Sequence, residues 1–522
     1  MNESRDIPLS YGQRALWFVQ RLAPGATAYN VSLPVRVRGV RDADVPALID
    51  AWQALADRHP VLRTTYPAPQ GSPVGRVHDR LPVDVAVVDA SSWSAEELDR
   101  RLGEEAHRPF RLEEGPVVRL RLFRRGEEEV VTLVSLHHIA IDFSSLAVVL
   151  DDLGKLYDQR TAQPPNRPTA QPTDQPTAQP PNRPTDLLPL AATYEDFSRW
   201  QAEMLAGPRG EELWTSWRDR LADAPPVLEL PFDHPRPRTQ SFRGGSLDVP
   251  LPESLIQGAK ELAAAEGTDL GTLLLAAFQA LLHRYTGRDD ILVGCPVPGR
   301  PWPELREVVG FFVSSVVVRS DFSGGPSFRA ALGRVRERAA EALAWQDYPF
   351  PLLVERLRPQ RDAGVSPIFQ VFFVLYQGEE ERVIRLLSGQ GGGALRTGGL
   401  TLEPYPLGGR ASMFDLSLMM SESGGRVAAT FQYNSDLFEA VTVARIADDY
   451  AALLGAVLAD PGQPVAALPA SLGEARRSAS ARQVPPTSAP LPDPDRSLDR
   501  AETRRALLER QKRLRSTTHR SR

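Results

Sequence analysis

LVSLHHIAIDFSSLAVVL, residues 133–150, is an apolar stretch interrupted by two adjacent histidines and an aspartate. The segment VVRLRLFRRGEEEVVTLVSLHH (117–138) predicts a hairpin that turns at RRGEEE and whose second strand runs into the histidine pair. Asp142, Ser144 and Ser145 are residue types that favour helix N-termini, so a helix is expected over 144–158. The stretch therefore predicts a strand, a turn and a helix, with ionisable side chains at the junction.

The histidine pair is the first candidate for chemistry. Neighbouring residues of a strand point to opposite faces, so His137 can hold the backbone while His138 faces a cavity, or the reverse. Imidazole is the natural base because its reference pKa is about 6.5. On these residues alone, a hydrogen-bonded core histidine is the simplest interpretation. A metal site is disfavoured because metalloprotease histidines stand at i, i+4 on a helix.

Composition limits the classes of function. The 522 residues are 42% hydrophobic and 24% charged, which predicts a soluble globular protein of two or three domains. A net charge of −5 gives no indication of nucleic-acid binding. No secretory signal or membrane span is recognisable, and the one cysteine, Cys295, allows no intrachain disulfide. We therefore expect a cytoplasmic protein.

The chain divides by composition into two mixed α/β lobes and a tail. The first lobe is expected over 1–190, and it contains a proline-rich insertion at 160–187 in which TAQPPNRPT occurs twice. The second lobe is expected over 191–466. The remaining residues, 467–522, are rich in Pro, Ser and Arg, with a possible basic docking helix at 501–515.

Strands and one buried helix are expected at particular places in the second lobe. The run LGTLLLAAFQALLHRY (270–285) is interrupted by polar residues and predicts a buried or amphipathic helix. The expected strands are DDILVGCPVPG (289–299), FFVSSVVVRS (311–320), IFQVFFVLYQ (368–377) and GRVAATFQYNS (425–435).

HHIAID matches the HHxxxD signature of the condensation domains of nonribosomal peptide synthetases, relatives of chloramphenicol acetyltransferase. Further segments resemble other motifs of this family in the same order, and the resemblance covers about 7–465. These segments are LSYGQRALWFVQRL (9–22), RHPVLRTTY (58–66), YEDFSRWQ (194–201), VGCPVPGRPWPELREVVGFFVSSVVVR (293–319), QDYPFPLLVERLRP (346–359) and SPIFQVFFVLYQ (366–377).

The resemblance implies a fold and a set of site residues. The fold is α/β (α+β), with two acetyltransferase-like lobes that form a V-shaped pseudo-dimer around a central tunnel. His138 is implied to be catalytic, with His137 in support. Asp142 is implied to be structural and to pair with Arg63, so that this clamp presents His138 to the tunnel.

Three residues depart from the family pattern and are expected at the tunnel or substrate. Phe143 follows the aspartate where the family usually has glycine, which leaves room for substrate. Ser314 stands where asparagine is often found. Trp345 precedes QDYPF where a smaller or polar residue is common, and it either walls the tunnel or packs in the core.

The activity implied is amide formation between a carrier-bound acyl or aminoacyl thioester and an amine, in nonribosomal peptide or hybrid biosynthesis of antibiotics and other secondary metabolites. No adenylation or carrier-protein motif is recognisable, so we expect a free-standing monomer that meets peptidyl or acyl carrier proteins in trans. No metal or cofactor is expected on the chain itself, because phosphopantetheine belongs to the carriers. The alternatives are an ester-forming acyltransferase, a non-catalytic platform that recruits a tailoring enzyme, and, least favoured, an epimerisation domain.

Overall fold

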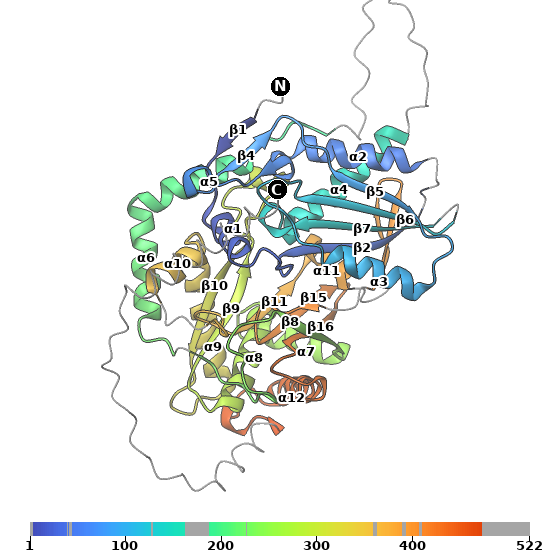
Figure 1. Ribbon diagram of the computed structural model, residues 1–522. Coiled ribbons are helices and arrows are strands. Elements are labelled where there is room, and N and C mark those ends of the chain that lie inside the picture. Colours follow the sequence, from blue (N-terminus) through green and yellow to red (C-terminus); the bar gives the residue numbers. More distant parts are fainter. Residues whose placement is uncertain are drawn as a thin grey trace, which may run out of the picture. The chain divides into compact units, whose positions relative to one another are not determined.

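The computed structural model describes residues 4–38, 40, 44–126, 129–161, 187–225, 227–358, 363–388, 393–406 and 410–471. All of these belong to one compact unit, Met1–Ala475 (Figure 1). Most of the predicted insertion at 160–187 and nearly all of the predicted tail at 467–522, including the helix at 501–515, lie outside the described residues.

A six-stranded sheet forms the centre of the first lobe, in the order β12-β13-β2-β7-β6-β5. Every residue of β7 is buried, and its alternate residues face different helices. Val131 and Leu133 pack against α3, whereas Val134 and Leu136 join the core under α2 and α4. The elements are β2 (Asn30–Arg38), α2 (Val45–Arg58), β5 (Asp84–Asp89), α3 (Ala95–Ala106), β6 (Val118–Arg124), β7 (Val130–His137) and α4 (Phe143–Thr161).

The second half of the chain supplies two strands of this first sheet. Strands β12 (Leu395–Thr397) and β13 (Leu400–Pro404) form a hairpin, and β13 pairs antiparallel with β2. The sequence-based division, which placed all of 191–466 in the second lobe, therefore differs from the structure at this hairpin. The physical reason is a close contact with α4, in which Thr397 Oγ1 donates a hydrogen bond to the Leu150 carbonyl at 2.7 Å.

Gly154 of α4 allows this close contact. A Cβ at this position would lie 2.1 Å from Thr397 Oγ1 and 2.5 Å from the Thr397 carbonyl carbon. We expect Gly154→Ala to lower the free energy of unfolding by about 1–3 kcal/mol through overpacking. Gly103→Ala in α3 is the matched control, because no heavy atom lies within 4 Å of its Cβ, and it should instead stabilise by about 0.5–1 kcal/mol. Urea unfolding of both variants tests this, and equal values would contradict the packing.

A seven-stranded sheet forms the second lobe, in the order β10-β9-β11-β15-β16-β8-β14. The predicted helix at 270–285 is confirmed as α8, of which nearly every residue is buried, and the four predicted strands are confirmed as β9, β10, β11 and β16. Strand β10 begins three residues later than expected, at Ser314. The strands are β8 (Arg243–Pro250), β9 (Asp290–Val297), β10 (Ser314–Asp321), β11 (Val371–Tyr376), β14 (Arg410–Ala411), β15 (Leu416–Ser423) and β16 (Arg426–Asn434).

Helices pack on this sheet and join it to the first lobe. Helix α11 contacts α4 and β13 of the first lobe as well as β11 and β15 of the second, so it lies at the junction of the lobes. The helices that remain are α1 (Tyr11–Leu22), α5 (Tyr194–Ala206), α6 (Pro208–Leu221), α7 (Glu253–Ala265), α8 (Leu270–Thr286), α9 (Phe328–Ala344), α10 (Phe350–Leu357), α11 (Gly378–Ser388) and α12 (Ala440–Ala459). A small sheet contains β1 (Ser4–Ile7), β3 (Thr64–Thr65) and β4 (Gly75–His78). The predicted mixed α/β architecture of two lobes is confirmed.

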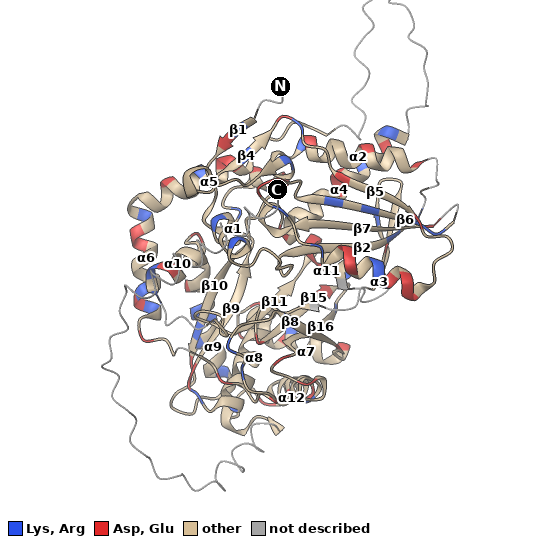
Figure 2. Cartoon of the chain, in the orientation of Figure 1, with Lys and Arg blue, Asp and Glu red and all other residues tan. Residues whose placement is uncertain are grey.

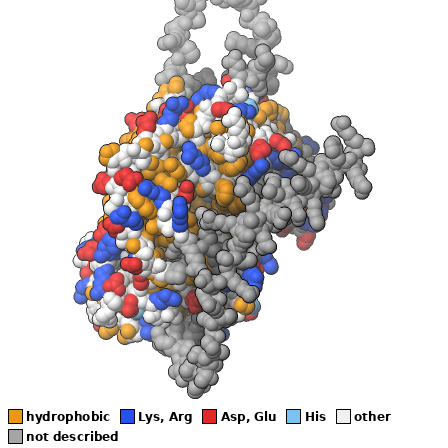
Figure 3. Space-filling model, turned by 60° about the vertical axis from the view of Figure 1, so that its left-hand side comes forward, with side chains coloured by type: hydrophobic (Ala, Val, Ile, Leu, Met, Phe, Trp, Pro, Cys, Tyr) orange, Lys and Arg blue, Asp and Glu red, His pale blue; other side chains and the backbone are white. Residues whose placement is uncertain are grey.

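Charge on the described surface is mixed in sign. Helices α3 and α6 each carry acidic and basic side chains along their length (Figure 2). The face in Figure 3 shows apolar, acidic and basic side chains interspersed. Among the described helices, none combines the length and the apolar character that crossing a membrane requires.

Candidate active site

His138 lies where β7 ends and a short 3-10 helix, η4 (His138–Ala140), begins. Its backbone N–H donates to the Tyr29 carbonyl at 2.9 Å, and the residue before it, His137, pairs with Asn30 of β2. The peptide on which the imidazole stands is therefore tied to a neighbouring strand. The His138 side chain itself is partly exposed.

The ring of His138 is held in one tautomer. Its Nδ1 lies 2.5 Å from the Ile141 carbonyl, and because a carbonyl oxygen only accepts, Nδ1 must carry the hydrogen. Nε2 is then left with a lone pair. Burial lowers the pKa of His138 below its usual value, although the hydrogen bond to Ile141 acts in the opposite direction. The ring is thus a neutral imidazole at neutral pH, with Nε2 ready to accept a proton.

His137 has the supporting position that the sequence analysis allowed for one of the pair. Its side chain is buried, and Nδ1 accepts a hydrogen bond from the Ile139 N–H at 3.1 Å. Burial lowers the pKa of His137 to about 3, so the ring stays neutral. It also packs edge-on against Phe110, with ring centroids 5.9 Å apart. His137 therefore fixes the turn that presents His138.

Asp142 is a buried carboxylate with several donors. Its oxygens accept from two nitrogens of Arg300, both at 3.2 Å, and from the Ser145 N–H at 2.7 Å. The backbone N–H groups of Phe312 and Val313 donate to it at 2.9 and 3.1 Å. Burial opposes the charge on Asp142, but the Arg300 guanidinium and the Ser145 hydrogen bonds outweigh it and hold the pKa below its ordinary value.

The predicted pairing of Asp142 with Arg63 is wrong. Arg63 ends a 3-10 helix and donates from Nε to the Asp57 carbonyl at 3.3 Å and from a terminal nitrogen to the His78 carbonyl. The physical reason is local, because the next residues form β3, which pairs with β4 and brings the end of β4 beside the arginine. Arg300 takes the expected role instead. It also donates to Ser145 Oγ at 2.7 Å and lies over the Phe312 ring, 4.2 Å from its centroid.

Phe143, which was expected at the tunnel or substrate, lies beside His138. Its ring lies 6.2 Å from the His138 ring and 5.8 Å from that of Tyr376, edge-on in both cases. Phe311 contacts His138 from another direction at 5.0 Å, also edge-on. The imidazole thus has aromatic neighbours from the first lobe and from the segment that leads into β10.

Ser314 and Trp345 have contacts within the second lobe. Ser314 Oγ accepts from the Phe350 N–H at 3.4 Å, which ties the start of β10 to α10. Trp345 packs edge-on against Trp217 at 5.3 Å, and its carbonyl accepts a hydrogen bond from the Trp217 indole at 3.1 Å. These contacts favour the packing alternative for Trp345, and neither residue is brought to His138 by a contact that the structure records.

Two residues that hold the site were not among the site residues expected from the sequence. Gln13 donates from Nε2 to the Ile139 carbonyl at 3.1 Å, so α1 supports the turn after His138. Tyr194 donates to the Phe311 carbonyl at 2.7 Å and so fixes the segment carrying Phe311. Both stand in segments that resemble family motifs, so their positions were marked, but a motif match does not say which atoms meet.

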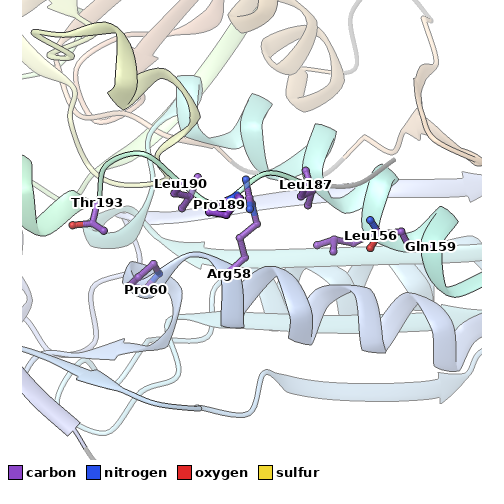
Figure 4. A pocket seen from close by; sticks show the side chains of 8 residues that line it. All are labelled: Arg58, Pro60, Leu156, Gln159, Leu187, Pro189, Leu190 and Thr193. Carbon is purple, nitrogen blue, oxygen red and sulfur yellow. The ribbon is translucent and has the colours of Figure 1, made fainter. Parts of the chain in front are cut away.

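Two cavities lie near α4. The larger, of about 1000 Å³, runs between α4, the segment after β9 and the start of α11, and Ser144, Arg300 and Gln377 are among its lining residues. The smaller, of about 580 Å³, lies on the other side of Arg58, with Leu156 and Leu190 in its wall (Figure 4). Because Arg300 binds Asp142 and also lines the larger cavity, that cavity adjoins the site.

In the described part of the chain, no group of three or more His, Cys, Asp and Glu side chains is placed to hold a metal ion. The chemistry that the arrangement does provide is that of a neutral imidazole on a rigid turn. Such a group accepts a proton from a nucleophile as that nucleophile attacks a carbonyl.

Comparison with known proteins identifies relatives of the whole described unit. The family model named Condensation domain matches residues 3–174 and 179–475. Linear gramicidin synthase subunits D and C of Brevibacillus parabrevis are 38% and 36% identical over 478 and 469 residues. The matched regions cover 90% and 89% of this chain but only 9% and 6% of those proteins. Among solved structures, the X-domain from teicoplanin biosynthesis, in complex with OxyB, is similar with a TM-score of 0.76 and 28% identity, covering 90% of this chain and 96% of that one.

Proposed function

This chain belongs to the condensation-domain family of nonribosomal peptide synthetases, and from that premise we propose that it catalyses amide formation. The donor is an acyl or aminoacyl thioester on a carrier protein, and the acceptor is an amine. One observation carries the proposal: the Nδ1–H of His138 is engaged by the Ile141 carbonyl, which leaves the lone pair of Nε2 free to accept a proton.

In the proposed reaction, His138 is the only protein group that gains and loses a proton. The amine nitrogen attacks the thioester carbonyl and loses a proton to Nε2. The new C–N bond forms, the C–S bond breaks, and the proton passes from the imidazolium to the departing carrier thiolate. Asp142 and Arg300 take no proton, because the pair is buried and hydrogen-bonded, and they act by holding the turn.

The partners complete the proposal. Carrier proteins supplied in trans present both substrates on their phosphopantetheine arms, the chain binds no cofactor of its own, and it acts as a cytoplasmic monomer. Intact-protein mass spectrometry of loaded carriers tests the reaction directly. The acceptor carrier should gain the mass of the donor acyl group, and no gain with any amine acceptor would refute amide formation. Replacing the amine by an alcohol in the same assay separates amide from ester formation.

The pH dependence should follow the neutral form of His138. Because the pKa of His138 is lowered by burial, the fraction of unprotonated imidazole stays high until the pH falls below about 6.5, the reference value. We expect kcat/KM to be flat above that pH and to fall tenfold per unit below a midpoint lower than 6.5. The assay should use a weakly basic amine as acceptor, so that the acceptor does not change its own protonation state over the measured pH range. A midpoint above 6.5 would contradict the assignment of this ring as the base.

A second candidate function is a binding platform that recruits a tailoring enzyme. It is favoured by the similarity to the teicoplanin X-domain and by Phe143, whose ring contacts the imidazole that a substrate must reach. Product formation in a reconstituted pathway discriminates the two. A platform would leave the product level undiminished when His138 is replaced by alanine, whereas an enzyme would not.

A further inference from the structure

Two aromatic rings from different lobes meet next to His138. Phe143 is the first residue of α4, and Tyr376 is the last residue of β11. Their rings are edge-on, with centroids 5.8 Å apart, and Phe143 is in turn edge-on to His138 at 6.2 Å. The three side chains therefore form a continuous line from β11 to the imidazole.

The sequence neighbours of both aromatic residues line the large cavity. Ser144 and Gln377 line the cavity of about 1000 Å³, and each is the sequence neighbour of one of the two aromatic residues. Ser144 also donates a hydrogen bond across the lobes to Glu380, another lining residue. The Phe143–Tyr376 contact therefore lies between His138 and residues whose sequence neighbours line the cavity.

The rings of Tyr376 and Phe143 differ in how freely they can move. Tyr376 is 6% exposed and packs with Val374 and Ile384, which are also buried, so its ring is fixed. Phe143 is partly exposed. Since buried side chains are held in place by close packing on all sides, the ring with open space beside it is the one able to move. Phe143 is therefore the adjustable member of the pair.

The hydroxyl of Tyr376 is a further observation. No recorded hydrogen bond is donated by it, and it is not among the fully buried polar atoms of the described residues that lack a partner. Burial raises the pKa of Tyr376, with Glu380 acting in the same direction, so the group stays an O–H donor. A substrate carbonyl or amide in the passage would accept a hydrogen bond from it.

We propose that Phe143 and Tyr376 form an aromatic gate that limits the size of the group admitted to His138 from the interlobe cavity. Reactants of small cross-section pass the gate, and those with a bulky substituent next to the reacting atom are rejected. Tyr376 also orients a polar group of the passing reactant. This inference rests on the proposed amide-forming function and specifies its substrate class.

The first test measures selectivity in the full-length protein. Two free amines that differ only in bulk beside the nitrogen, ethylamine and a branched aromatic amine, serve as acceptors with the same carrier-bound donor. For Phe143→Ala, we expect the ratio of kcat/KM for the bulky amine to that for the small amine to rise at least tenfold, because steric discrimination of this kind is worth about 10–200-fold. Phe143→Leu should give a smaller rise, and Val441→Ala, which changes an exposed side chain on α12, should give none.

Tyr376→Phe separates the two parts of the gate. It keeps the ring and removes the hydroxyl, so the bulk selectivity should stay unchanged while KM rises for acceptors that carry a carbonyl. Thermal unfolding of each variant establishes that the protein is folded. An unchanged bulk ratio in folded Phe143→Ala would overturn the gate.

A second readout needs no catalysis. Diethylpyrocarbonate acylates neutral imidazoles, and the rate at which it modifies His138 can be followed by mass spectrometry of the peptide. Phe143→Ala should raise that rate several-fold, with Val441→Ala as control. Unaltered labelling would count against the gate even if amide formation fails. Conversely, full activity of His138→Ala would refute the proposed function and leave the labelling result standing, so the two failures are distinguishable.

Discussion

Replacing His138 with alanine is expected to lower kcat for amide formation by about 10²–10⁴, the usual contribution of a positioned general base. The loss should not be complete, because two tethered reactants held in contact retain the benefit of proximity, which can be worth as much or more. Transfer between loaded carriers, followed by intact-protein mass spectrometry in single-turnover conditions, measures the chemical step.

The control for this variant is another histidine on the same lobe. His107 follows α3, is exposed, and places its Nδ1 2.8 Å from the Gly103 carbonyl, an arrangement that resembles the bond of His138 to Ile141. His107→Ala should therefore leave kcat unchanged. If His138→Ala kept the full rate and gave the same carrier products as the unaltered protein, His138 would not be the base. The binding-platform function would then be favoured.

The local structure around His138 was predictable because short-range patterns determine it. The segment 117–138 was predicted to form a hairpin because its apolar residues span two strands separated by a polar turn. The structure has this hairpin as β6 and β7. The helix expected from 144 begins one residue earlier, at Phe143, with Asp142 accepting the Ser145 N–H at its start. In each case the residues that decide the structure lie within a few positions of one another.

Partner choice across the chain was not predictable in the same way. Arg63 and Arg300 both stand in segments that resemble family motifs, and nothing in either segment says which guanidinium meets Asp142. Strand β3 directs Arg63 toward the His78 carbonyl, whereas the chain after β9 brings Arg300 to the buried carboxylate. The hairpin at 395–404 is a similar case, because a pairing with β2 depends on residues more than 350 positions away.

The Asp142–Arg300 pair ties the lobes together at the catalytic turn. Asp142 stands on the turn after β7, and it accepts hydrogen bonds from Arg300 and from the backbone at Phe312 and Val313, which belong to the second half of the chain. The two side chains are 2% and 8% exposed, so neither charge is compensated by water. Loss of the cation would leave a buried carboxylate with backbone donors alone.

Arg300→Leu is therefore expected to lower the free energy of unfolding by about 3–5 kcal/mol, the usual effect of removing one partner of a buried pair. Arg63→Leu should cost less, because Arg63 donates only to backbone carbonyls and leaves no charge unpaired. Urea unfolding of both single variants gives the comparison.

A double-mutant cycle identifies the cation that Asp142 uses. In an Asp142→Asn background the buried charge is already absent, so Arg300→Leu should cost markedly less than in the unaltered protein, whereas the cost of Arg63→Leu should not change. The cycle tests the pairing directly, because Arg300 and Arg63 are the two candidate partners of one carboxylate. If the coupling energy appeared between Asp142 and Arg63 and vanished for Arg300, the turn would be held as the motif resemblance alone implies, and the clamp described by the structure would be wrong.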